Sequence, residues 1–350
     1  MNKKPINKKP TNNKNETITL IVVLSICLVV LAVITVSLFA KKDDSTLAAD
    51  TKSQHVEMAL FEGMKLADAK EMLRSAGISY EIIPTQSKMP NKVEKIEYVG
   101  KVENGKTLIE IGTTVKLHAN EVASDKIVYL TFDDGPIVNY TDSTLQTIYH
   151  NTGEILDILN QYDAKATFFL VGNQMIKSDR VKYVKDIYNQ GHLIACHSFS
   201  HNFDYIYQST DNFMLDIERF ENELKVILGE ETYNSIGKYM RFPGGTIKNG
   251  IIDRQAATSY ISAVREAGYK VYDWTSLTGD AEGKETPEEM MSYMISTLED
   301  AKNRNRPLIL LMHDKDSTKE ALPKILDYLI SKGYYFDTID NCPEYTDVEN

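Results

Sequence analysis

Two adjacent carboxylates and two nearby histidines are the residues of this chain best suited to bind a metal ion. Asp133 and Asp134 follow an apolar run and precede a Gly-Pro turn. His197 and His201 follow another apolar run, and their spacing of four predicts that both rings lie on one side of a helical turn. Each pattern alone is ambiguous, because Asp-Asp-Gly-Pro also forms ordinary turns and paired histidines also occur in packing roles.

A third apolar run delivers His313 and Asp314 in the same way. Two histidines and one carboxylate suit zinc with an open fourth position, as in hydrolytic sites, and they also suit the iron of a non-haem oxygenase. The remaining carboxylate and histidine favour hydrolysis, because hydrolysis needs a base and an acid beside the metal.

Alternating strand-like and helix-like segments are expected to position these residues. The apolar runs that predict strands are 127–132, 166–171, 192–196, 270–274 and 308–312. Helical patterns lie near 153–161, 179–189, 211–228, 256–267, 287–303 and 318–331. Apolar strands separated by helices indicate an α/β fold with a parallel sheet covered on both faces, and this many units allows closure into a barrel. The carboxyl ends of such strands meet at one rim, where the acidic residues and histidines would converge.

Five segments resemble the signatures of the polysaccharide deacetylases, carbohydrate esterase family four. They are Thr131-Phe-Asp-Asp-Gly-Pro136, Ala166-Thr-Phe-Phe169, His197-Ser-Phe-Ser-His201, Arg241-Phe-Pro-Gly-Gly245 and Leu311-Met-His313. They follow the family's order within residues 126–340. The resemblance implies a distorted (β/α) barrel over 121–350 and a metal-dependent hydrolase that removes acetyl groups from a polysaccharide. It disfavours the oxygenase.

The resemblance also assigns the metal ligands and the base. Asp134, His197 and His201 would hold one divalent ion, with Zn²⁺ expected and Co²⁺ as the alternative. Asp133 would be the general base for a metal-bound water, whose pKa the metal lowers to about 7. Arg241 would keep Asp133 ionised, although an arginine in this position also fits a plain surface ion pair.

Further residues are expected around the substrate. His313 would protonate the departing amine, and a backbone N–H near Phe242 would stabilise the oxyanion. Trp274 and Leu311 would wall the acetyl pocket, although Trp274 also fits simple core packing. Asp280 is interpreted as a substrate-loop or structural residue.

The fourth signature of the family is incomplete in this chain. Leu277 stands where the family often carries an aspartate, so the sequence does not identify the residue that adjusts the pKa of His313. An apparent insertion at 140–151 would shape the substrate groove. Asp314 is interpreted as stabilising its local turn.

The segment before the predicted catalytic domain, residues 54–120, reads as a small α+β module. Helical spacing at 66–73 is followed by strand-like runs at 78–82, 93–99 and 107–117. The stretch 61–78 and the closing 111–117 resemble a PASTA repeat, which implies either muropeptide binding or a spacer.

Residues 18–40 contain no charged side chain and are long enough to span a bilayer as an uncleaved transmembrane helix. Five lysines precede this segment, so we expect residues 1–17 in the cytoplasm. The rest, beginning with a linker at 41–53, would then be extracellular at the cell membrane. That position favours peptidoglycan N-acetylglucosamine as the substrate. The alternatives are the muramic acid unit, poly-N-acetylglucosamine, chitin oligomers and an inactive glycan-binding relative.

Charge and cysteine content exclude other classes. The net charge is −11, with +4 on residues 1–40 and −15 on the remainder, so nucleic acid is not an expected partner. No cysteine pair has metal-site spacing. Cys196 and Cys342 are predicted to be buried free thiols, although a disulfide between them is an alternative.

Overall fold

The computed structural model describes residues 55–58, 61–103, 106–137, 139–140, 148–149, 151–247 and 252–349. The chain divides into two compact units, with the boundary near residue 119, and a short segment, 86–90, groups with the second unit. The predicted cytoplasmic segment, anchor and linker, residues 1–53, lie outside the described residues. Within the described part of the chain, no helix has the length and apolar character needed to cross a membrane.

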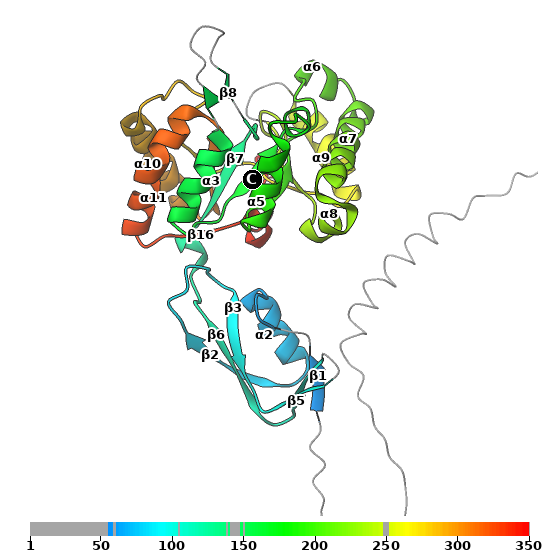
Figure 1. Ribbon diagram of the computed structural model, residues 1–350, viewed down its shortest axis with the longest axis vertical. Helices are drawn as coiled ribbons and strands as arrows, with labels where there is room; N and C mark the ends of the chain where they lie inside the picture. Colours follow the sequence, from blue (N-terminus) through cyan, green and yellow to red (C-terminus); the bar gives the residue numbers. More distant parts are fainter. Residues whose placement is uncertain are drawn as a thin grey trace, which may run out of the picture. The chain divides into compact units, whose positions relative to one another are not determined.

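Among its described residues, the first unit contains one helix and two small three-stranded sheets (Figure 1, blue to cyan). Its elements are β1 (His55–Met58), α2 (Leu66–Ser75), β2 (Ser79–Pro84), β3 (Val93–Glu97), β4 (Gly100–Glu103), β5 (Lys106–Glu110) and β6 (Thr114–Ala119). The sheets have the orders β1-β5-β4 and β2-β6-β3. Leu66, Ala69 and Leu73 bury one face of α2 against the strands.

The predicted single strand at 107–117 is wrong. The chain turns between β5 and β6, and Gly112 adopts a φ of +90° there, a conformation that favours glycine. The predicted strand at 93–99 also ends earlier, at Glu97, and β4 follows it as a separate element.

The second unit carries an eight-stranded sheet in which every pairing is parallel. Its strands are β7 (Ile127–Asp133), β10 (Thr167–Leu170), β11 (Leu193–Cys196), β12 (Tyr239–Met240), β13 (Lys270–Val271), β14 (Ser276–Leu277), β15 (Leu308–His313) and β16 (Tyr335–Asp337). The order is β13-β12-β11-β10-β7-β15-β14, and β16 pairs with β7 beside β10. A two-stranded ladder, β8 (Asn139–Tyr140) with β9 (Ile148–Tyr149), overlaps the predicted insertion at 140–151.

Helices cover this sheet on both sides. The α-helices are α3 (Asn151–Gln161), α4 (Gly172–Met175), α5 (Val181–Asn189), α6 (Phe203–Ile206), α7 (Thr210–Leu228), α8 (Glu230–Ile236), α9 (Arg254–Glu266), α10 (Pro287–Asn303) and α11 (Asp316–Ser331). Short 3-10 turns are η1 (Ser124–Lys126) and η2 (Ile339–Asn341). Figure 1 shows α10 and α11 on one side of β7, and α7, α8 and α9 on the other.

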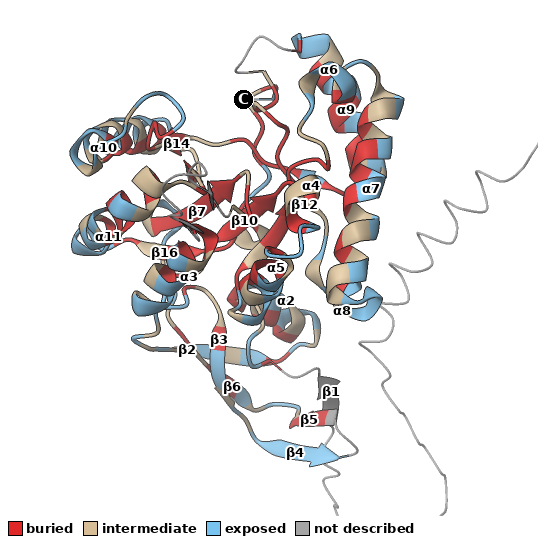
Figure 2. Ribbon diagram, turned by 45° about the horizontal axis from the view of Figure 1, so that its top comes forward, coloured by how far each residue is buried: buried red, intermediate tan, exposed pale blue. Residues whose placement is uncertain are grey.

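The sheet forms the centre of the hydrophobic core. All seven residues of β7 are buried, and β15 is buried except at its last residue. Figure 2 shows the strands as buried, with helices that expose one face and bury the other. The continuous apolar runs therefore form strands because both faces of the sheet are covered.

Most predicted elements of this unit are confirmed within a few residues. The strand expected at 270–274 is shorter, since β13 ends at Val271. No ladder joins β13 to β14 among the described residues, so the sheet is a half-barrel. Cys196 and Cys342 are both buried and free, as predicted.

Candidate active site

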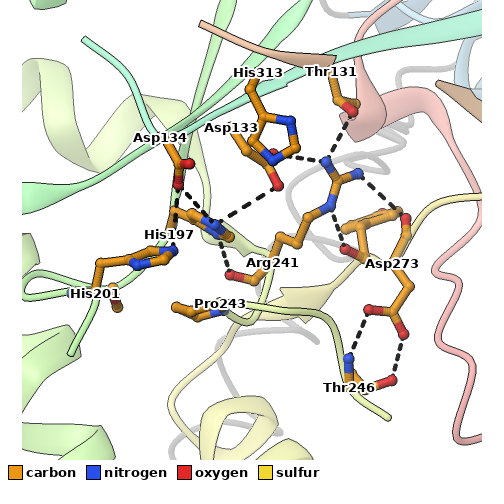
Figure 3. A network of polar contacts seen from close by, with 12 residues as sticks. Thr131, Asp133, Asp134, His197, His201, Arg241, Pro243, Thr246, Asp273 and His313 are labelled. Carbon is orange, nitrogen blue, oxygen red and sulfur yellow. Dashed lines mark hydrogen bonds and ion pairs between the residues drawn. The ribbon is translucent and has the colours of Figure 1, made fainter. Parts of the chain in front are cut away.

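Three strand ends bring the predicted acidic residues and histidines to one rim of the sheet. Asp133 is the last residue of β7, His197 follows β11, and His313 is the last residue of β15. The parallel register places His313 opposite Asp133. Figure 3 shows these side chains converging from separate strands. The predicted convergence is therefore confirmed, because neighbouring parallel strands end at the same edge.

The segment from His197 to His201 is an irregular loop, so the predicted helical turn is wrong. Ser198 and His201 have φ values of +68° and +51°, in the left-handed region. The buried carboxylate of Asp216 holds this loop by accepting hydrogen bonds from the N–H groups of Phe199, at 2.5 Å, and Ser200, at 3.1 Å. The two rings still meet, because these turns bend the chain back around the site.

Asp134, His197 and His201 form a group suited to a metal ion. An oxygen of Asp134 lies 3.6 Å from Nε2 of His197 and 3.3 Å from Nε2 of His201. Two ligands about 2.1 Å from one tetrahedral ion stand about 3.4 Å apart, so these spacings fit. Nδ1 of His197 contacts the carbonyl of Arg241 at 2.9 Å, which directs Nε2 towards the site.

The protonation state of His201 also fits a ligand role. Burial, together with the neighbouring ring of His197, lowers the pKa of His201. A neutral imidazole has a lone pair available for a metal, whereas an imidazolium does not. The three residues therefore satisfy the donor chemistry of a divalent site.

Arg241 is buried behind the base and makes no surface ion pair. Its guanidinium donates to the carboxylate of Asp133 at 2.8 Å and to the hydroxyl of Thr131 at 2.9 Å. It also donates to the carbonyls of Tyr272 and Asp273, at 3.0 and 3.3 Å (Figure 3). Such a fixed cation holds the carboxylate in one orientation, with its second oxygen, Oδ2, 3.7 Å from Nε2 of His197.

Asp280 lines the cavity and is hydrogen-bonded to His313, which gives it a supporting role that the sequence did not predict. One oxygen of Asp280 contacts Nδ1 of His313 at 2.8 Å, and the other accepts from the His313 N–H and from Thr318, both at 2.6 Å. Burial alone would lower the pKa of His313, but the hydrogen bond to Asp280 and its charge outweigh burial, so the pKa is raised. Asp280 thus supplies the tuning that the fourth signature left unassigned.

The contact between Asp280 and His313 predicts a change in pH dependence. A general acid must be protonated, so the rate should fall as pH rises through the pKa of His313. Asp280→Asn removes the charge that raises this pKa, so the alkaline limb, the fall of kcat on the alkaline side, should move to lower pH. The shift is about one pH unit if the variant loses about 1.4 kcal/mol of the interaction that stabilises protonated His313. Initial rates from pH 5 to 10 measure the shift.

A matched variant separates this effect from general damage. Thr318→Val removes one hydrogen bond to Asp280 and keeps its charge, so the limb should stay near its wild-type position. An unchanged alkaline limb in Asp280→Asn would show that Asp280 does not tune the acid.

A cavity of about 250 Å³ opens onto these groups. It is lined by Asp133, Asp134, His197, His201, Phe203, Gly244, Trp274, Leu277, Gly279, Asp280, Ala281, Glu282, Leu311 and His313. Trp274 and Leu311 thus line the cavity, as predicted, and Leu277 adds a third apolar side chain.

For Phe242, the prediction concerns a nearby backbone N–H and not the aromatic ring. Its side chain is fully buried in the core against Phe213 and does not line the cavity. Gly244, two residues later, lines the cavity. Among the described residues, no group accepts a hydrogen bond from the N–H of either Phe242 or Gly244. A backbone donor near Phe242 therefore fits an oxyanion role, and Gly244 is the one at the cavity wall.

Several contributing residues were missed from the sequence. Phe203 follows the second histidine by two positions, and Glu282 follows Asp280 by two, so proximity to the signatures was the only signal. The interpretation of Asp314 as stabilising its own turn is wrong: its carboxylate accepts hydrogen bonds from Thr152 and from the N–H of Ile137, so it supports the distant loop that follows Asp134.

The fold and the site define a class of protein. A triad that could hold a metal ion, beside a carboxylate and a histidine at the carboxyl ends of a parallel sheet, fits a hydrolase that activates water. A family profile described as Polysaccharide deacetylase matches residues 120–271. The polysaccharide deacetylase Bc1974 from Bacillus cereus is 30% identical over 61% of this chain and 91% of its own, with a TM-score of 0.47. By this sequence similarity, the chain belongs to the polysaccharide deacetylase family.

Two further relatives have a named substrate. The catalytic domain of peptidoglycan N-acetylglucosamine deacetylase from Eubacterium rectale is 28% identical, covers 63% of this chain and 92% of its own, and has a TM-score of 0.51. A peptidoglycan-N-acetylglucosamine deacetylase of Bacillus cereus is 28% identical over 267 residues, which are 76% of this chain and 88% of that protein.

Proposed function

We propose that this protein hydrolyses the acetamide of N-acetylglucosamine units in peptidoglycan, releasing acetate and leaving a free amine on the sugar. The observation that carries the proposal is that one cavity contains every group that the hydrolysis needs. A metal-binding triad, a base paired with Arg241 and an acid paired with Asp280 all face it. A catalytically inactive glycan-binding relative would need none of these pairings intact.

On the water side, Asp134, His197 and His201 would hold the divalent ion, for which Zn²⁺ suits a carboxylate and two imidazoles. When bound, such an ion polarises the acetamide carbonyl and makes water more acidic. Asp133 accepts the proton of the attacking water, and Arg241 keeps its carboxylate oriented for that transfer. The N–H of Gly244, at the cavity wall, would donate to the oxyanion.

On the amine side, His313 donates its proton to the sugar nitrogen as the C–N bond breaks. Asp280 holds Nδ1 of the ring, which leaves Nε2 for the transfer. Trp274, Leu277 and Leu311 offer an apolar wall for the acetyl methyl group. Different side chains therefore act on the carbonyl carbon and on the nitrogen of the amide bond.

The substrate assignment is supported by two relatives whose names specify peptidoglycan N-acetylglucosamine. The uncharged segment at 18–40, with lysines before it, supports a cell-membrane anchor with the catalytic unit outside, within reach of the wall. Protease added to intact cells should then cut the catalytic unit before lysis. The PASTA-like module at 54–120 would serve as a spacer or bind wall fragments.

The substrate is tested on purified cell walls. Walls from a deletion strain, incubated with residues 121–350, should gain glucosamine in their muropeptides by mass spectrometry, and the deletion strain should be more sensitive to lysozyme. Heat-inactivated protein is the control. Deacetylation confined to muramic acid, to poly-N-acetylglucosamine or to chitin oligomers would replace peptidoglycan N-acetylglucosamine with that substrate.

A further inference from the structure

Glu282 is an acidic side chain of the cavity that the reaction does not use. It lies in the loop between β14 and α10, two residues after Asp280, and it is exposed. The hydroxyl of Tyr293, on α10, donates to its Oε2 at 2.8 Å. Because Tyr293 belongs to a regular helix, this hydrogen bond holds the carboxylate in place and leaves Oε1 towards solvent.

The charge of Glu282 is not neutralised by an ion pair. No lysine or arginine among the described residues lies within ion-pair distance of it, and none lines the cavity. Two lysines lie nearby, but neither forms an ion pair with Glu282. Lys284 places Nζ 5.7 Å from the ring centre of Tyr293, and Lys315 donates to the backbone carbonyl of Asp280 at 3.1 Å.

Part of the cavity wall is apolar, from Trp274, Leu277 and Leu311, and offers no partner to an anion. The deeper ionisable groups are those assigned to the metal and to proton transfer. An anionic substituent directed towards this loop would meet the charge of Glu282 at the exposed rim of the cavity, where like charges repel and salt screens the repulsion.

We propose that Glu282 is a specificity-determining residue that disfavours sugars with a negative charge beside the reacting acetamide. The inference rests on the proposed function and deepens it. N-acetylglucosamine is neutral at that position, whereas a muramic acid unit without its peptide carries a lactyl carboxylate on the carbon next to the acetamide. Repulsion of the unwanted substrate is a common basis of selectivity.

Internal competition within one polymer tests the proposal. Glycan strands stripped of their peptides contain both sugars, so mass spectrometry after partial reaction gives the ratio of muramic acid to glucosamine deacetylation. Wild type should strongly favour glucosamine. Glu282→Gln should raise the muramic acid share roughly 3- to 10-fold, the size expected for one partly screened charge, and Glu282→Lys should raise it further.

Two controls make the outcome specific. Glu266→Gln removes the same charge from α9, on a surface that does not line the cavity, and should leave the ratio unchanged. For the wild type, raising salt from 20 to 500 mM should raise the muramic acid share, because exposed charges are screened.

The results separate the inference from the proposed function. An identical ratio in wild type, Glu282→Gln and Glu282→Lys, with no salt effect, would overturn the inference while glucosamine formation still upholds the proposed function. If wild type deacetylates neither the strands nor neutral N-acetylated chitotetraose, the proposed function fails and the inference fails with it.

Discussion

Removal of divalent metal should abolish deacetylation, and Zn²⁺ or Co²⁺ should restore it. The reason is that Asp134, His197 and His201 present three donor atoms within 4.8 Å of one another, close enough for one ion to bind all three. His197→Ala or His201→Ala should lower the bound metal to well below one equivalent and reduce kcat by at least about 10³-fold, the scale of lost metal activation.

The measurement is metal content by plasma emission, made on the same samples as the rates. His118→Ala is the matched control, because His118 belongs to the first unit and contacts Glu97. It should keep full metal and full rate. Undiminished turnover by a chelated sample shown to be metal-free would refute the metal-dependent mechanism.

The second large effect is expected at the base. Asp133→Asn keeps the shape of the side chain but removes its ability to accept a proton, so kcat should fall roughly 10²–10⁴-fold, the usual size of a general acid–base contribution. Metal should stay bound, because Asp133 is not one of the three ligands. Some stability should be lost as well, since Arg241 would be buried without its anionic partner.

The adjacent aspartate gives the matched comparison. Asp134→Asn should lower metal affinity first and activity as a consequence, so excess Zn²⁺ should recover part of its rate but none of the rate of Asp133→Asn. If Asp133→Asn empties the site and Asp134→Asn does not, the two roles are exchanged.

The two aspartates show how far a sequence can define a site. Asp133 and Asp134 were assigned different roles from a family signature, and the structure provides a reason for the difference. Asp133 ends a buried strand and meets Arg241, whereas Asp134, with a φ of +71°, turns towards His201. Adjacent residues reach opposite sides of the site because the chain leaves the strand between them.

The sequence by itself determined the α/β class, most helices and the convergence of three strand ends. These follow from local patterns, since apolar runs and helical periodicity depend on neighbours along the chain. Residues that share a signature could likewise be assigned together, because the spacing within a signature is itself local.

Tertiary structure alone decided which distant residues complete the site. The sequence could not show that Asp280 binds His313, 33 positions away. Nor could it show that Phe242 packs inward while Gly244 lines the cavity. It also could not show that the loop holding His197 and His201 contains residues with left-handed backbone conformations. Each depends on where separate strands end in space and on how loops are held, as Asp216 holds the histidine loop. Such contacts leave no periodic trace in a sequence, because their energy comes from packing and hydrogen bonds between segments that are far apart in the chain.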